Sequence, residues 1–331
     1  MNDQEILIQQ CKDRVGNKNL ANEISDLLGV NVDAAYRRMR GTTALTFDEI
    51  KKLCLHFNIS FDSVINYSGT LVPFQFNAMY NKDFSIYQYL KTIADQLDLL
   101  AKGEDNRFVI TAMDLPYFRQ FGFRSLSRFK LFFWQRSVLN LPEFQAVAFD
   151  VKPGDDDQYD EVTQRIFEKY HGVSSTEIWT PETLDSTIKQ VQYYAEAGMF
   201  ARIETAFKIC DDIDLLLTKV EQEAQFGKKI ADTKSGVVRG NFELYQSDIY
   251  LSNNSIQAFA GDKIFTYVSF NSFNSLMSFT PNFSEECHAW IEQIRLKSIL
   301  LSEVSEKLRY QYFYGLRKKL NDLRALLEHY R

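Results

Sequence analysis

Apolar residues recur at helical spacing through most of this 331-residue chain, but the recurrence stops in the stretch NYSGTLVPFQFN at residues 66–77. Gly69 and Pro73 lie in this stretch, and both residue types interrupt regular structure. A chain of this length is long enough for about two or three domains. The sequence therefore predicts three parts: an N-terminal domain at residues 1–68, a linker at 69–79 and a larger domain at 80–331.

The first 68 residues have the pattern of five short helices with tight connections. Leu20 and Ile24 begin the apolar face of the second helix, and Gly29 follows its end, where glycine is preferred. Thr46 and Glu49 have the spacing of a capping box, in which each side chain accepts a hydrogen bond from the other residue's backbone. We therefore expect a small all-helical domain that can fold alone.

The third predicted helix carries two separate faces. At 100° per residue, its apolar residues fall within about 60° of one another on an inward stripe: Val32, Ala35 and Met39. Other residues gather on an outward stripe: Asp33, Tyr36, Arg37 and Arg40, with Arg38 at its edge. A helix-turn-helix needs a second helix with one face to the core and the other to DNA. Arginine suits that outer face because it reads guanine through two hydrogen bonds and also binds phosphate.

The positive charge that suits DNA is local to the third predicted helix. The whole chain has a net charge of −6, and residues 1–68 contain 8 Lys and Arg against 9 Asp and Glu, a net charge of −1. Non-specific attraction to phosphates is therefore weak. A basic helix face can also be solvated or salt-bridged. A scaffold or interaction protein, whose helical domain recognises another protein, thus stays the alternative to a DNA-binding protein.

The segment LANEISDLLGVNVDAAYRRMRGTTALTFDEIKKLCLHFNISFDSVI resembles the Cro/repressor-type (XRE-like) helix-turn-helix and is similar to BetR-type domains. The matching features are LLGV at the turn, Gly41 at the end of the recognition helix, and the helix pair that follows. Ala35 and Arg38 depart from the family pattern, which has a larger aliphatic residue and often a buried aromatic there. The resemblance covers residues 1–68, and the rest of the chain is not recognised.

The resemblance implies a sequence-specific DNA-binding transcriptional regulator with double-stranded DNA as its partner. It also implies which residues approach base edges: Asn31, Asp33, Tyr36 and Arg37. The residues that it places near the DNA backbone are Arg38, Arg40 and Thr42.

The larger domain reads as mainly α. RFVITAMDLP predicts a strand, the aromatic-rich stretch that follows predicts a buried helix, and residues 157–171, 181–197 and 199–228 have helical periodicity. Residues 237–280 alternate instead, with turn signals at Asn253-Asn254 and Gly261-Asp262, which predicts a small antiparallel β-meander. Helices are expected again over 284–330. The predicted fold class is thus mainly α: a five-helix N-terminal domain and an α-rich domain with a small meander.

Two features suggest what this larger domain does. The stretch YFRQFGFRSLSRFKLFFWQ can form a core, or can line a pocket for a small-molecule or peptide effector, with Arg119, Arg124 or Arg128 holding an anion at its rim. An apolar stripe near the C-terminus can join two copies as a homodimer, or can pack on its own domain: Leu301, Val304, Leu308, Tyr312, Leu316, Leu320, Leu323 and Leu327. Since one recognition helix covers few base pairs, we expect the homodimer.

No pattern in the sequence favours catalysis. Phosphate loops, dinucleotide fingerprints and hydrolase motifs are missing, so we expect neither an enzyme nor a cofactor. The acidic runs at 154–161 and 210–214 suit charged helix surfaces, and the four histidines are isolated, so we expect no metal site. Four separated cysteines, an acidic start and the lack of a long apolar run predict a cytoplasmic protein without a signal peptide or a membrane span.

Overall fold

The computed structural model describes residues 2–15, 20–65, 72–80, 84–103, 105–151, 157–232, 237–249, 251 and 253–331. The chain divides into two units, Met1–Phe74 and Gln75–Arg331, each with its own core. Part of the predicted linker, residues 69–71, lies outside the described residues, as do the expected end of the first helix at residues 16–17 and part of the acidic run at 154–161.

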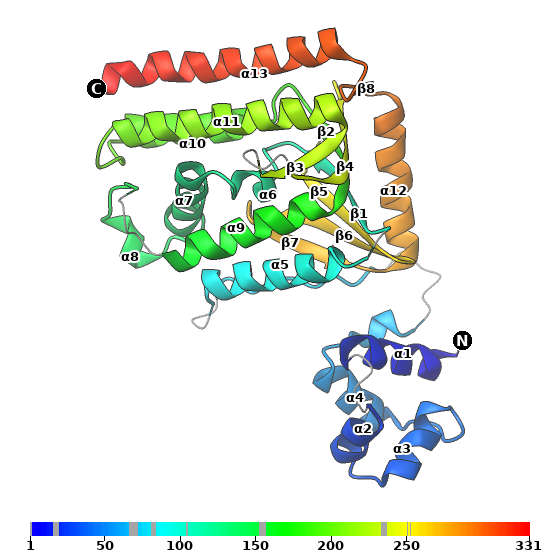
Figure 1. The fold of residues 1–331 in the computed structure, drawn as a ribbon. Coiled ribbons are helices and arrows are strands. Elements are labelled where there is room, and N and C mark those ends of the chain that lie inside the picture. The colour runs from blue at the N-terminus through cyan, green and yellow to red at the C-terminus, as the bar shows by residue number, and fades with distance from the viewer. Residues whose placement is uncertain are drawn as a thin grey trace. The chain divides into compact units, whose positions relative to one another are not determined.

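The N-terminal unit is helical, which confirms the expectation for this part of the chain (Figure 1). Its elements are α1 (Asp3–Val15), α2 (Leu20–Leu28), α3 (Val32–Met39), α4 (Phe47–His56) and a 3-10 turn, η1 (Phe61–Ser63). The predicted capping box forms at the start of α4. The apolar faces of these elements share one core: Leu7, Ile8, Cys11, Leu20, Ile24, Ala35, Leu53, Phe57, Ile59 and Val64.

The second unit is built on one eight-stranded sheet, with strands in the order β3-β4-β2-β1-β5-β6-β7 and β8 paired with β4. The strands are β1 (Arg107–Ala112), β2 (Ser174–Trp179), β3 (Lys228–Asp232), β4 (Val237–Gln246), β5 (Ser255–Ala260), β6 (Lys263–Phe270), β7 (Asn274–Ser278) and β8 (Ile299–Leu300). β1, β2 and β4 run parallel to one another, and the other pairs are antiparallel.

The predicted mainly α fold with a small antiparallel β-meander is therefore wrong for this unit. β5, β6 and β7 do form a meander, but β4 lies beside β2, and β2 and β1 together separate it from β5. β2 was not among the predicted strands because it is short and lies between two strongly periodic helices. Parallel strands are joined by long crossover connections, so their pairing leaves no local repeat in the sequence.

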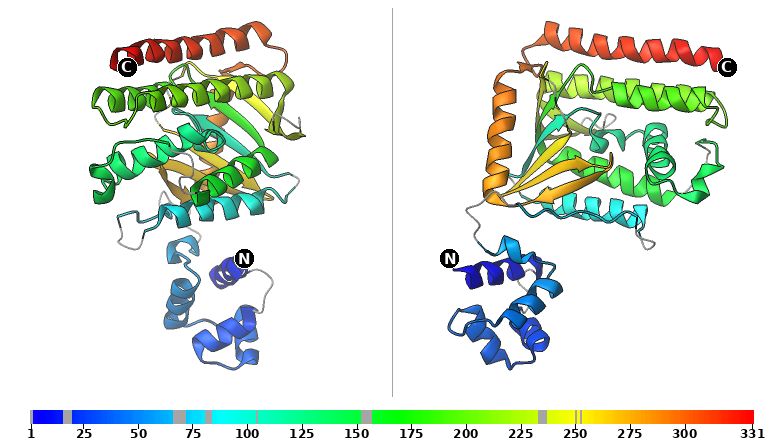
Figure 2. Two further views of the ribbon diagram at one scale, coloured as in Figure 1. Left: turned by 60° about the vertical axis from the view of Figure 1, so that its left-hand side comes forward. Right: turned by 180° about the vertical axis from the view of Figure 1, so that it is seen from behind.

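Helices cover both faces of the sheet, but unequally (Figures 1 and 2). α12 (Pro281–Leu296) lies on one face, and the remaining helices lie on the other or around its edges. They are α5 (Ile86–Leu100), α6 (Tyr117–Gln120), α7 (Arg124–Phe133), the π-helix η2 (Trp134–Val138), α8 (Pro142–Gln145), α9 (Asp157–Gly172), α10 (Asp185–Glu196), α11 (Glu204–Phe226), α13 (Glu306–Leu327) and the 3-10 turn η3 (Glu328–Tyr330).

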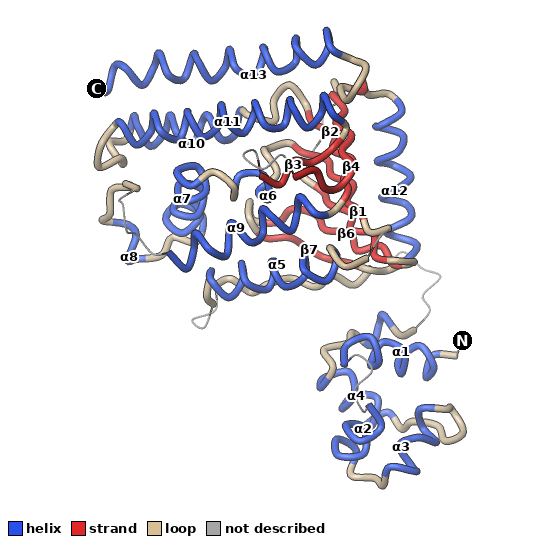
Figure 3. Tube along the Cα trace, viewed as in Figure 1, coloured by secondary structure: helices blue, strands red, loops and turns tan. Residues whose placement is uncertain are grey.

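Alternation along β1 fixes these two layers. Phe108 and Ile110 point into the large core beneath the many helices, whereas Val109 points into the smaller core beneath α12. The tube drawing in Figure 3 shows the sheet between the two helical layers. The carboxyl ends of the parallel strands β1 and β2 therefore meet at one edge, where loops from both strands can form a site.

The C-terminal helical region differs from the expected one because β8 and a turn separate α12 from α13. Leu316, Leu320 and Leu323 are buried against α10 and α11, whereas Val304 is 90% exposed. Most of the apolar stripe thus packs within its own unit, which was the alternative to a dimer surface. Gly315 stays inside α13.

Candidate nucleic-acid interface

The turn between α2 and α3 is fixed by local hydrogen bonds. Gly29 adopts a φ of +66°, which a glycine tolerates without strain. The Ser25 hydroxyl donates to the Val30 carbonyl at 2.6 Å. The Asn31 side chain then caps α3 by accepting a hydrogen bond from the Ala34 amide at 2.8 Å. The angle between the two helices is therefore set before any partner binds.

α3 keeps the two faces that the sequence predicts, with one shift. Ala35 is fully buried and Met39 packs on the core, but Val32 lies at the rim and is 39% exposed. The outward residues are all exposed: Asp33, Tyr36, Arg37 and Arg40. The Arg40 guanidinium lies 5.8 Å from the centre of the Tyr36 ring, where a cation–π contact orients both side chains.

Arg38 lies apart from this exposed face and contacts α4. Its Nε and Nη2 donate to Glu49 Oε1 at 3.1 and 2.9 Å, and its Nη1 donates to the Ala34 carbonyl at 3.3 Å. The two charged side chains are only 17% and 14% exposed. The hydrogen bond from Arg38 lowers the pKa of Glu49, so this carboxyl stays ionised. This ion pair joins α3 to α4.

The end of α3 is closed by Thr42. Its amide and its hydroxyl both donate to the Arg37 carbonyl, at 3.0 and 2.9 Å. Gln4 of α1 holds the next residues, because its amide nitrogen donates to the carbonyls of Arg38 and Thr43 and its oxygen accepts from the Leu45 amide. No sequence pattern indicates this role of Gln4, since its partners lie more than thirty residues away.

The three arginines considered for an effector pocket lie in ion pairs of the second unit. Arg124 and Arg128 each donate to Asp160 at 2.8 Å. Arg119 is buried between two carboxylates, with its Nε at 3.0 and 2.9 Å from the oxygens of Glu177 and its Nη1 at 2.7 Å from Glu223. Within the described part of the chain, none of the three lines either of the two cavities described below.

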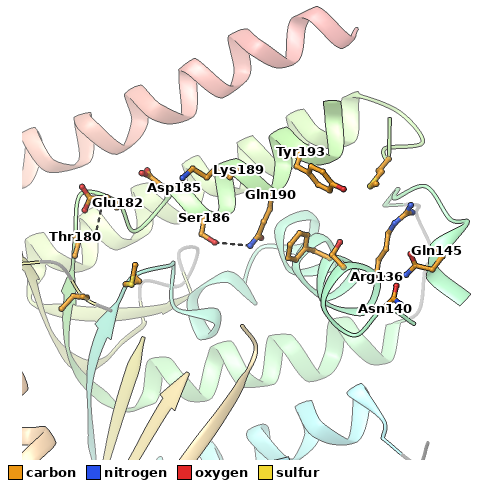
Figure 4. Close-up of a pocket in the computed structure, with 15 residues that line it drawn as sticks. Arg136, Asn140, Gln145, Thr180, Glu182, Asp185, Ser186, Lys189, Gln190 and Tyr193 are labelled. Carbon is orange, nitrogen blue, oxygen red and sulfur yellow. Dashed lines mark hydrogen bonds between the residues drawn. The ribbon is translucent and has the colours of Figure 1, made fainter. Parts of the chain in front are cut away.

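An open cleft of about 810 Å³ lies at the carboxyl ends of β1 and β2, where Met113 and Thr180 follow the two strands. Figure 4 shows Lys189 and Tyr193 of α10 on one side of this cleft and Arg136 on the other. Such an edge of a parallel sheet is a common place for ligands. The cleft belongs to the second unit alone.

Several of the other acidic and histidine residues contact side chains on neighbouring helices. Asp211 and Asp214 of α11 accept from Arg324 and Arg317 of α13 at 2.9 and 3.3 Å, and His56 contacts Glu23 at 2.8 Å. Among the described residues, no group of three His, Cys, Asp or Glu side chains is placed to hold a metal ion. No helix within the described ranges has the length and apolar character needed to cross a membrane.

Comparison with known proteins gives one family match. Residues 5–80 match the model of the BetR domain, a helix-turn-helix-type DNA-binding domain. The match includes most of α1 and all of α2, α3 and α4, and therefore the exposed face of α3. No curated protein and no solved structure gives a significant match to the chain.

Proposed function

We propose that this protein is a sequence-specific transcriptional regulator, of the Cro/repressor type, that reads the major groove of DNA with α3. The exposed face of α3 carries this proposal, because Arg37, Arg40, Tyr36 and Asp33 project from a short helix whose ends are both fixed. A rigid helix of this kind loses little conformational entropy on binding. The BetR match over residues 5–80 supports the same class of function.

Each exposed residue has a role that its chemistry suits. Arg37, in the middle of the face, donates two hydrogen bonds to a guanine, and Asp33 accepts from a cytosine amino group. Tyr36 supplies an apolar contact to a thymine methyl group. Arg40, at the end of α3, pairs with a phosphate.

Arg38, Asn31 and Thr42 have different roles in this proposal. Arg38 donates to Glu49, the Asn31 side-chain oxygen accepts from the Ala34 amide, and the Thr42 hydroxyl donates to the Arg37 carbonyl. These residues therefore position α3, and their contribution to DNA binding is indirect.

We also propose that the regulator is a homodimer whose second unit senses an effector. One α3 helix and a domain of net charge −1 cannot supply much specificity, so two half-sites about one DNA turn apart are needed. The buried stripe of α13 is not the dimer surface. All four cysteines are free, which fits a protein of the reducing cytoplasm, and the proposal includes no enzymatic step.

Selection of bound sequences from random duplex DNA tests this function. The wild-type chain should enrich one motif with two half-sites, and Arg37→Ala should relax the preference at one position of each. Lys12→Ala is a charge-matched control, because Lys12 is exposed and lies more than two turns beyond Gln4 in α1. Failure of the wild-type chain to enrich any motif would contradict the proposal.

A scaffold function is the second candidate, and a specific observation favours it. Phe47 and Leu55 of α4 are 71% and 73% exposed, and the Phe47 ring packs edge-on against Phe61. Exposed apolar side chains of this size are typical of protein contacts. In that case Phe47→Ser and Leu55→Ser would abolish partner binding, and substitution of Arg37 would have no effect.

A further inference from the structure

A second cavity of about 280 Å³ lies deeper in the same unit, beside the open cleft. The two cavities adjoin, because Met113, Phe133, Ser186 and Gln190 line both. The volume is close to the lower end of the roughly 300–1,000 Å³ typical of small-molecule sites. Besides aliphatic residues, five aromatic residues line it: Tyr117, Phe133, Trp134, Tyr267 and Phe273.

Two polar atoms of the residues that line this cavity have no hydrogen-bond partner among the described residues. They are Oε1 of Gln120 and Nε1 of Trp134, and each residue is only 2% exposed. The amide nitrogen of Gln120 donates to the Leu115 carbonyl, so the oxygen is the free end of that side chain. Buried polar atoms are rarely left unpaired, because the cost of removing them from water is then not recovered. One is an acceptor and the other a donor.

The local backbone is also unusual. Trp134 begins the π-helix η2, and its carbonyl accepts from the Leu139 amide at 2.9 Å in the wider turn of that helix. Short π-helices are rare and frequently occur at functional sites. The wider turn here coincides with the residue that carries the unpaired donor.

The charges around the cavity are already compensated. Lys130 Nζ lies 3.0 Å from Asp114 Oδ2 and also donates to Thr187 and Gln190, at 3.1 and 2.9 Å. Burial raises the pKa of Tyr267 to about 12, so this phenol stays neutral. A charged ligand would therefore lack a counter-ion in this cavity, whereas a neutral ligand needs none.

We propose that this cavity binds a small, uncharged, planar aromatic molecule that accepts a hydrogen bond from Trp134 Nε1 and donates one to Gln120 Oε1. The aromatic walls provide stacking and edge contacts for a flat ring. The adjoining cleft gives the route of entry. A role of this ligand in regulating DNA binding rests on the proposed function. Binding of the ligand to the cavity is independent of that function.

Benzimidazole and indazole are suitable probes, because each carries one ring N–H and one ring acceptor. Calorimetry on the full chain should detect binding of these probes but not of naphthalene, benzoate or benzylamine, which lack the hydrogen-bonding pair or carry charge. Trp134→Phe keeps an aromatic ring and Gln120→Met keeps the length of the side chain, while each removes one hydrogen-bond partner, so each should weaken binding about 3- to 10-fold. Trp290→Phe is the matched control, because Trp290 is exposed on α12 across the sheet.

The proposal would be overturned if wild type and both cavity variants bound the probes equally. It would also be overturned if wild type bound neither neutral probe, in which case the cavity holds water only. Hydrogen exchange of η2 and α6 shows whether a variant is folded. If Trp134→Phe unfolds the unit, the comparison of probes on wild type and Gln120→Met still decides. DNA binding is measured separately, so a protein that binds probes but no DNA refutes only the regulatory function.

Discussion

Arg38 should stabilise the packing of α3 on α4 and should not contact DNA. Arg38→Met keeps the aliphatic stem and removes the guanidinium, and Glu49→Gln removes the charge but keeps a residue suited to the capping box. Exposed ion pairs contribute about 0.2–1 kcal/mol, whereas breaking a fully buried pair costs about 3–5 kcal/mol. The Arg38–Glu49 pair is mostly shielded, so a double-mutant cycle should give a coupling free energy of about 1–2 kcal/mol.

Hydrogen exchange of the α3 and α4 amides in the full chain measures this coupling without interference from the second unit. DNA binding supplies the second readout. Each phosphate that is neutralised contributes about 0.9 to the slope of log affinity against log salt concentration. Arg38→Met should therefore leave the slope unchanged, whereas Arg40→Ala should reduce it by about one. A coupling near zero, or a reduced slope for Arg38→Met, would refute this role of Arg38.

Three other predictions concern stability and organisation. Leu323→Ala should lower the free energy of unfolding of the second unit by about 2–5 kcal/mol in chemical denaturation, and an unchanged stability would contradict the burial of Leu323 where α13 packs on α10 and α11. Burial alone would raise the pKa of Glu223, but the Arg119 guanidinium outweighs it and lowers that pKa. The stability that follows from this lowered pKa is fully present above the usual carboxyl pKa of about 4.3 and is lost as pH falls below it. The melting temperature should therefore drop on acidification. An unchanged melting temperature would contradict the Arg119–Glu223 ion pair. Limited proteolysis should cut first within residues 66–77 and leave a stable C-terminal fragment, whereas a first cut inside β5–β7 would argue against that boundary.

The parts that the sequence predicted well are those that depend on neighbouring residues. The periodicity of the N-terminal helices, the capping box of Thr46 and Glu49, and the exposed face of α3 all arise within a few residues of one another. The burial of Ala35 follows from the same spacing. Such features can be read locally because helical geometry repeats every 3.6 residues.

The parts that the sequence did not predict depend on distant partners. β2 pairs in parallel with β1, more than sixty residues earlier, and nothing local to SSTEIW specifies that register. The partner of Arg38, Glu49, is on another helix. The helical angle of about 100° per residue therefore placed Arg38 only at the edge of the exposed face. The aromatic-rich stretch is largely buried as expected, but it forms α6, α7 and η2 and not the single predicted helix. The unpaired polar atoms belong to Gln120 and Trp134, which line a cavity together with residues of β5, β6 and β7. Those strands lie far away in the sequence, so the cavity cannot be read locally.

If Arg37 of α3 reads a base, Arg37→Ala must weaken the affinity of the protein for the selected duplex. Affinity should fall about 5- to 150-fold, equivalent to about 1–3 kcal/mol, and the variant should no longer distinguish the selected base pair from its replacement at one position of each half-site. Lys12→Ala should bind within about twofold of wild type, because surface changes away from such contacts cost little. Equal affinities for the two variants, or full base discrimination by Arg37→Ala, would contradict recognition through α3.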